Sequence, residues 1–202
     1  MTEIELSGKK YPICMDLNIL ADLQDKYGSI AEFEHQLRGL VRSKDGKGWV
    51  EGKEPSAKVI AYTLPLMINE ALEIQADNDK RYPVERVSRI RIINEVDKSP
   101  KELAGIITEE LAYAMAVKKK DSDEYRQQEE EEIDSITVDF DFIRVMCRTK
   151  LGYTSREAGH IMIGRFVDEF TIYKQSFNLE KTGIYIVDDG HLDDIGDFLH
   201  GN

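Results

Sequence analysis

The sequence has few cysteines for the disulfides that stabilise small secreted domains, and no long apolar segment of the kind that crosses membranes. Its two cysteines, Cys14 and Cys147, stand far apart in apolar stretches, so we expect two reduced core thiols and no disulfide framework. No apolar run approaches the ~20 residues that span a bilayer. The acidic first residues, MTEIE, lack the apolar segment of a secretory signal. We therefore expect a cytoplasmic protein that binds no membrane.

The sequence also lacks the motifs that carry catalysis. It has no glycine-rich phosphate loop after a strand, no Gly-x-Ser-x-Gly and no His-Glu-x-x-His. The four histidines share no metal-ligand spacing with each other or with the cysteines. We expect His35 at the surface, His160 in packing or solvent contact, and residues 188–194 in a solvated acidic tail. We predict no catalytic, cofactor-binding or metal-binding residue, and an enzyme is the minority hypothesis.

Positive charge is scarce relative to negative charge. The chain has 39 acidic and 27 basic residues, for a net charge of −12, and 33% of its 202 residues are charged. Such a surface repels phosphate backbones and anionic lipid, so we expect no nucleic-acid partner. The hydrophobic fraction of 41% is enough to form a core in a chain of this length.

The chain opens with a predicted β-hairpin. Apolar and polar residues alternate through residues 3–15, on either side of a turn at Gly8. An isolated hairpin is marginally stable, so its apolar face must pack on a helix or join another chain's sheet. We take Leu6, Tyr11 and Ile13 as partner-binding candidates, with core packing as the alternative role.

Three helix starts carry the same signal. Ser29, Ser99 and Thr154 are each followed three residues later by glutamate, which is the pattern of the capping box. In this motif the hydroxyl accepts from the third amide of the helix, and the glutamate accepts from the amide of the capping residue. The sequence therefore predicts helices that begin at these positions, and another that begins after Asp16 or Asn18.

Glycine and proline mark the region between the second and third helices. Residues 43–55 contain three glycines and a proline, which predicts a loop or a short hairpin insertion. We expect its only tryptophan, Trp49, to be buried in the protein, and the alternative is an exposed side chain that contacts a partner. Residues 56–75 then predict a helix that Pro65 either kinks or splits in two.

A basic helix is predicted at residues 83–96. Its predicted apolar stripe contains Val84, Val87 and Ile90. On an acidic protein, a basic patch can bind an acidic partner or another subunit through charge complementarity. The partner-binding candidates here are Arg86, Arg89 and Arg91, and the alternative is an ordinary solvated helix face.

The last predicted helix has an aromatic face. Phe166, Phe170 and Tyr173 recur at helical spacing, and we take them as partner-binding candidates, with core packing as the alternative. The helices on either side of Gly152 have the outline of a helix-turn-helix. The second of them carries carboxylates such as Asp168, which would face DNA phosphates, so DNA reading is disfavoured.

These elements predict a mainly α fold with a small N-terminal β-hairpin (α+β), in which a helical domain is followed by a short helical C-terminal module. The hairpin and helical domain occupy residues 1–117, and residues 118–134 form a charged linker or helix extension. The C-terminal module covers residues 135–178, and residues 179–202 form an acidic tail.

Short motifs give the chain a family resemblance. The hairpin segment GKKYP at residues 8–12 is followed by KYGS at residues 26–29. The second unit carries VDFDF at residues 138–142 and LGYT at residues 151–154. The first unit resembles the tail assembly chaperones of long-tailed bacteriophages and prophages, and the second is similar to the short helical modules encoded beside them.

The resemblance implies a non-enzymatic protein of the bacterial host cytoplasm. It would bind the tape measure protein, keep it soluble, and then yield to the tail tube protein. Its partners would be these two proteins and further copies of itself, and it would need no cofactor. Two alternatives stay open: a structural tail or head–tail connector component that persists in the particle, and a helix-turn-helix DNA-binding regulator.

Overall fold

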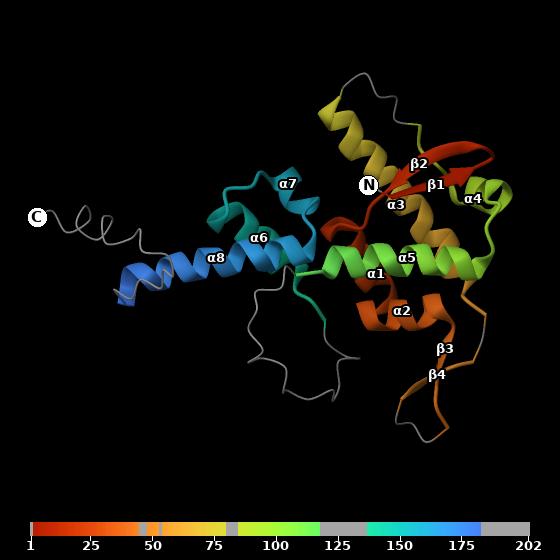
Figure 1. Ribbon diagram of the computed structural model, residues 1–202, viewed down its shortest axis with the longest axis horizontal. Helices are drawn as coiled ribbons and strands as arrows, with labels where there is room; N and C mark the ends of the chain where they lie inside the picture. Colours follow the sequence, from red (N-terminus) through yellow and green to blue (C-terminus); the bar gives the residue numbers. More distant parts are fainter. Residues whose placement is uncertain (1, 45–47, 53, 80–84, 118–136, 183–202) are drawn as a thin grey trace, which may run out of the picture.

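A computed structural model describes residues 2–44, 48–52, 54–79, 85–117 and 137–182. Within them the predicted class is confirmed, because helices predominate and a small antiparallel hairpin opens the chain. The elements, shown in Figure 1, are β1 (Thr2–Leu6), β2 (Lys9–Ile13), α1 (Leu17–Tyr27), α2 (Ile30–Arg38), β3 (Leu40–Arg42), β4 (Trp49–Glu51), α3 (Ala57–Asn78), α4 (Arg89–Glu95), α5 (Pro100–Met115), α6 (Phe140–Lys150), α7 (Ser155–Gly159) and α8 (Ile163–Thr182). None of the helices in these residues is long and apolar enough to cross a bilayer.

The opening hairpin packs on a helix of its own chain. Strands β1 and β2 pair antiparallel with Ile4 opposite Tyr11, and β2 lies against α3. At the turn, Ser7 and Gly8 both have positive φ, and the Ser7 amide donates to the Glu95 carbonyl at 3.1 Å. The apolar face of the hairpin is therefore part of the core.

The three capped helix starts are confirmed. The hydroxyls of Ser29, Ser99 and Thr154 each accept from the amide three residues later, at 3.0, 3.3 and 3.2 Å. At Ser99 and Thr154 the glutamate also accepts from the backbone amide of the capping residue, which completes the capping box. Local sequence is sufficient for this motif because it involves only one helical turn.

The region between α2 and α3 forms the predicted short hairpin, with β3 and β4 antiparallel. Trp49 is half-buried, and its ring lies 3.7 Å from the ring of His35, centroid to centroid. His35 is accordingly half-buried, which differs from the predicted surface position. Pro65 lies buried inside α3, which continues through it as one helix, so the predicted split does not occur.

The basic segment differs most from its prediction. Helix α4 begins at Arg89, with Ser88 as its cap, and residues 80–84 lie outside the described residues. Its buried face carries Ile92, whereas Ile90 is 71% exposed. The predicted stripe was therefore wrong at Ile90, because a helix that begins later presents a different face to α3.

The residues directly before α4 belong to no helix or strand, and α3 holds them in place. The side-chain amide of Asn69 accepts from the Val87 amide at 2.7 Å and donates to the Val87 carbonyl at 3.0 Å. These two bonds fix the backbone of Val87 against α3, and its side chain is buried. The helix can begin only after this anchored residue.

The C-terminal module packs on the first unit, and the two share one apolar core. Phe140 and Ile161 belong to the same cluster as the residues of α1 and α3. The helix predicted to begin at Thr154 is divided into α7 and α8, and α8 projects beyond the helices it packs against (Figure 1). The predicted linker and most of the predicted acidic tail lie outside the described residues.

Candidate functional site

The structure places the three groups of predicted partner residues in different environments. Leu6, Tyr11 and Ile13 are buried in the core, so they have the alternative role that the sequence left open. Their burial follows from the packing of β2 on α3, which covers the apolar face of the hairpin. In the folded monomer, these side chains are not available to a partner.

The basic segment is largely neutralised by carboxylates of the same chain. Arg86 pairs with Glu73 at 2.7 Å. Arg91 pairs with Glu85 at 2.9 Å and with Glu95 at 3.0 Å. The predicted basic patch therefore presents a mixed surface, because two of its three arginines are already engaged.

The predicted aromatic face of the last helix forms a stack along α8. The ring centroids of Phe166 and Phe170 are 5.3 Å apart, and those of Phe170 and Tyr173 are 5.9 Å apart, with nearly parallel planes. Phe166 is buried, while Phe170 and Tyr173 are half-buried. The stack therefore leads from the core onto the projecting part of α8.

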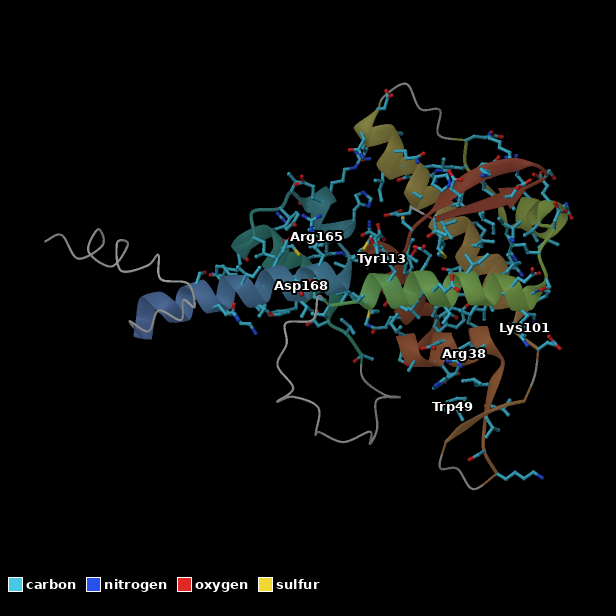
Figure 2. The ribbon with its side chains drawn as sticks, viewed as in Figure 1. Arg38, Trp49, Lys101, Tyr113, Arg165 and Asp168 are labelled. Carbon is cyan, nitrogen blue, oxygen red and sulfur yellow. The ribbon has the colours of Figure 1, made fainter. Side chains whose placement is uncertain are left out.

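Many of the exposed apolar side chains belong to α8, which carries this stack, or to the helices that α8 packs on. Among the described residues, ten large apolar side chains are exposed, and seven of them lie at or just after the end of α5 or on α6 and α8. These elements meet, since α8 packs on both α5 and α6; Figure 2 labels Tyr113 on α5 and both Arg165 and Asp168 on α8. The seven residues, called here the α5–α6–α8 surface, are Tyr113, Met115, Val117, Phe142, Val145, Val167 and Ile172.

A polar cluster lies where the C-terminal module meets the first unit. His160, which ends α7, has its Nδ1 3.0 Å from Asp16 Oδ2 and 3.0 Å from Glu70 Oε1. Asp16 caps α1 and has a side chain only 2% exposed, while Glu70 projects from α3. Three ionisable groups from three elements thus converge at one partly buried point, and we call them the Asp16–Glu70–His160 cluster.

Neighbouring residues hold this cluster in place. Asn18 donates from its side chain to Glu70 Oε1 at 2.9 Å and accepts from Arg144 at 3.2 Å. The Leu17 amide donates to the Ile161 carbonyl at 3.0 Å, directly beside Asp16 and His160. A Cβ at Gly159 would lie 2.6 Å from Asn18 Oδ1, so any larger residue here would displace the Asn18 side chain that orients Glu70.

The cluster changes the proton affinities of its members. The hydrogen bond to Asp16 raises the pKa of His160 above its ordinary value, in spite of partial burial. Burial, followed by the negative charge of Asp16, raises the pKa of Glu70. Two carboxylates that face one imidazole nitrogen thus favour a bound positive species between them.

A solvent-open cavity of about 730 Å³ borders the cluster on the side of His160. Arg156, which forms an ion pair with Asp77, also lines it. Tyr153 lies in the same wall and donates to Glu169 Oε2 at 2.6 Å. Burial and this hydrogen bond raise the pKa of Tyr153 to about 12, so the phenol is neutral near pH 7.

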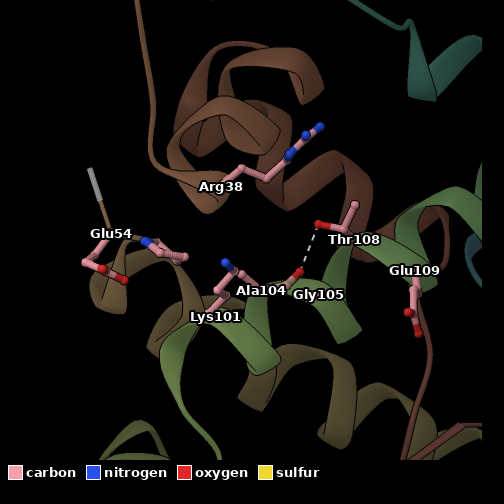
Figure 3. Close-up of a pocket in the computed structure, with 8 residues that line it drawn as sticks. Arg38, Glu54, Lys101, Ala104, Gly105, Thr108 and Glu109 are labelled. Carbon is pink, nitrogen blue, oxygen red and sulfur yellow. Dashed lines mark hydrogen bonds between the residues drawn. The ribbon is translucent and has the colours of Figure 1, made fainter. Parts of the chain in front are cut away.

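A second cavity, of about 540 Å³, lies between α2 and α5 (Figure 3). Arg38 and Lys101 contribute positive charge to its lining, and Glu54 and Glu109 contribute negative charge. In its floor, the Thr108 hydroxyl donates to the Ala104 carbonyl at 2.8 Å. Its balanced charges favour neither an anion nor a cation.

Sequence reasoning missed the cluster. The sequence predicts Asp16 only as a possible helix cap and His160 only in packing or solvent contact, and 144 residues separate the two. Spacing motifs detect ligands on one element, so they carry no signal for three ligands from three elements.

Comparisons of the sequence with protein-family models and with curated proteins, and of the fold with solved structures, found no match.

Proposed function

We propose that this chain is a phage tail assembly chaperone-like protein that binds the tape measure protein during tail morphogenesis and catalyses no reaction. The short motifs of its hairpin and C-terminal module support the family. The α5–α6–α8 surface is the observation that carries the proposal, because it offers apolar side chains to another polypeptide.

The chemistry of this surface suits a long helical client. Phe142 and Val145 are 49% and 52% exposed, and they lie three residues apart on one face of α6. The apolar stripe of an amphipathic helix can cover such a face. Full burial of an apolar side chain contributes about 1.5–3 kcal/mol, so a few contacts per copy give weak binding.

Weak binding by several copies fits a temporary carrier. Multivalent contacts hold a long client in solution, and each copy can still be displaced by polymerising tail tube protein. The net charge of −12 keeps the loaded assembly soluble through mutual repulsion. The protein would act in the host cytoplasm and would leave before the particle matures.

Co-expression tests this function. The chain is produced with the tape measure protein encoded in the same tail gene cluster, and the soluble fraction of the tape measure protein is measured. We expect the wild type to raise that fraction severalfold, and Phe142→Ser with Val145→Ser to abolish the gain. The matched control is Ile90→Ser with Ile93→Ser, an exposed pair at the same spacing on α4 that should retain the gain.

Two results would contradict the proposal. One is a tape measure protein that stays equally insoluble with and without the wild-type chain. The other is the presence of this chain in stoichiometric amounts in purified particles, measured by mass spectrometry. The second result would support a structural tail or connector component.

A further inference from the structure

We propose that Asp16, Glu70 and His160 bind a divalent transition-metal ion of the zinc type, which fastens the C-terminal module to the first unit. The ligand atoms are His160 Nδ1, Asp16 Oδ2 and a carboxylate oxygen of Glu70. One ligand atom from each residue lies within 4.8 Å of the others. No motif in the sequence reveals this site, because its three ligands come from three separate elements.

The spacing of these atoms suits such an ion. Zinc lies at about 2.0–2.2 Å from nitrogen and oxygen ligands, so tetrahedral ligand atoms are separated by about 3.4 Å. The two distances of 3.0 Å from His160 Nδ1 are close to this separation, and small side-chain rotations would reach it. Imidazole with two carboxylates favours zinc-like ions over Mg²⁺ and Ca²⁺, which prefer oxygen ligands alone.

The charges in the cluster also favour a cation. Asp16 and Glu70 face the same nitrogen of His160, and one N–H at this position cannot fully satisfy both carboxylates. The nearby guanidinium of Arg156 is paired with Asp77. A dication would neutralise both carboxylates without requiring either to hold a proton.

The surroundings pre-organise the ligands. Asp16 Oδ1 accepts from the Ile19 amide at 3.1 Å, which leaves Oδ2 directed at His160. Asn18 orients Glu70 through its side-chain amide. Such outer hydrogen bonds orient the ligands of known metal sites. The cavity that borders His160 can supply water to the remaining coordination position.

The placement defines what the ion would do. Its three ligands come from the start of α1, from α3 and from the end of α7, so one ion would link the module to two helices of the first unit. The site is structural in this proposal. It is independent of the α5–α6–α8 surface, and either proposal can fail without the other.

The test uses the full chain, stripped of metal with EDTA and dialysed. Zn²⁺ is titrated by competition with a chromophoric chelator, the bound metal is counted by mass spectrometry, and Co²⁺ is added as a visible-absorption probe. We expect one ion per chain. Because a ligand that binds only the folded state stabilises it, Tm should rise by about 5 °C or more at saturating Zn²⁺.

Two variants locate the ion, and a third variant is the matched control. Glu70→Gln and His160→Gln should each weaken Zn²⁺ binding at least about tenfold and remove the Tm rise. Glu73→Gln changes a carboxylate on the same helix that pairs with Arg86, and it should bind like the wild type. Circular dichroism checks that each variant folds without metal. If His160→Gln does not fold, the Zn²⁺ affinity of Glu70→Gln alone tests the site.

The proposal is overturned if the wild type shows neither bound Zn²⁺ nor a Tm rise. It is also overturned if both variants bind Zn²⁺ as tightly as the wild type, because the ion would then lie elsewhere.

Discussion

The side-chain amide of Gln24 makes two hydrogen bonds of 2.8 Å with the backbone of Val138, one to its carbonyl and one from its amide. A carboxamide thus pairs with a backbone segment as a neighbouring strand would. Asn69 does the same for Val87. In both cases, a side chain of one helix anchors the backbone of a residue that lies two positions before the start of another helix, α6 or α4.

The first prediction concerns this anchor. Gln24→Ala removes both hydrogen bonds, so we expect the free energy of unfolding to fall by about 1–3 kcal/mol. Hydrogen exchange at the Val138 amide should accelerate. Urea denaturation measures the first effect. Gln36→Ala is the control, because Gln36 makes only an exposed bond within α2. An equal loss of stability in the two variants would contradict a role for Gln24 in holding Val138.

The second prediction concerns two helical glycines. A Cβ on Gly164 would overlap the backbone carbonyl of Ala116, whereas a Cβ on Gly105 would meet nothing within 4 Å. Gly164→Ala should therefore push α8 away from α5 and destabilise the fold by about 2–3 kcal/mol. Gly105→Ala should stabilise it by up to about 1 kcal/mol, since alanine is the better helix former. Thermal unfolding measures the change in stability of both variants. A change of the same sign in the two would contradict the close packing of α8 on α5 at Gly164.

The third prediction concerns the capping box of α7. Thr154→Ala removes the hydroxyl that accepts from the Glu157 amide, which should lower stability by about 1 kcal/mol at pH 7. Thr149→Ala is the control, because its exposed hydroxyl bonds only within α6.

The pH dependence of this cap has a definite sign. Hydrogen bonds from the Thr154 side chain and backbone lower the pKa of Glu157 below its usual value near 4.5. Its stabilisation is therefore complete above that value and is lost as the pH falls through the lowered pKa. Titration of Glu157 by NMR should show a higher pKa in Thr154→Ala, and an unchanged pKa would disprove the link.

The fourth prediction concerns the two thiols. Burial raises the pKa of both Cys14 and Cys147, so little thiolate exists at pH 8. We expect iodoacetamide to leave both unmodified in the native protein and to modify both in guanidinium chloride. Ser176→Cys adds an exposed thiol on α8 as a positive control. Rapid native alkylation at Cys14 or Cys147 would show that the core opens there.

Part of the candidate site could be predicted from sequence, and part could not. That Phe166, Phe170 and Tyr173 share one face of a helix follows from their spacing alone, whereas the stacking of their rings comes from the structure. The exposure of Phe142 and Val145 depends on which face of α6 meets its neighbours, and no spacing in the chain specifies that.

The sequence by itself determined the features that need only a few adjacent residues. The hairpin turn and the caps at Ser29, Ser99 and Thr154 are of this kind, because each donor and its acceptor lie within one turn. Only the tertiary structure decided that Ile92 is buried rather than Ile90, and that Asp16 and His160 meet Glu70. These outcomes depend on contacts between distant segments, whose geometry is set by the packing of the whole core.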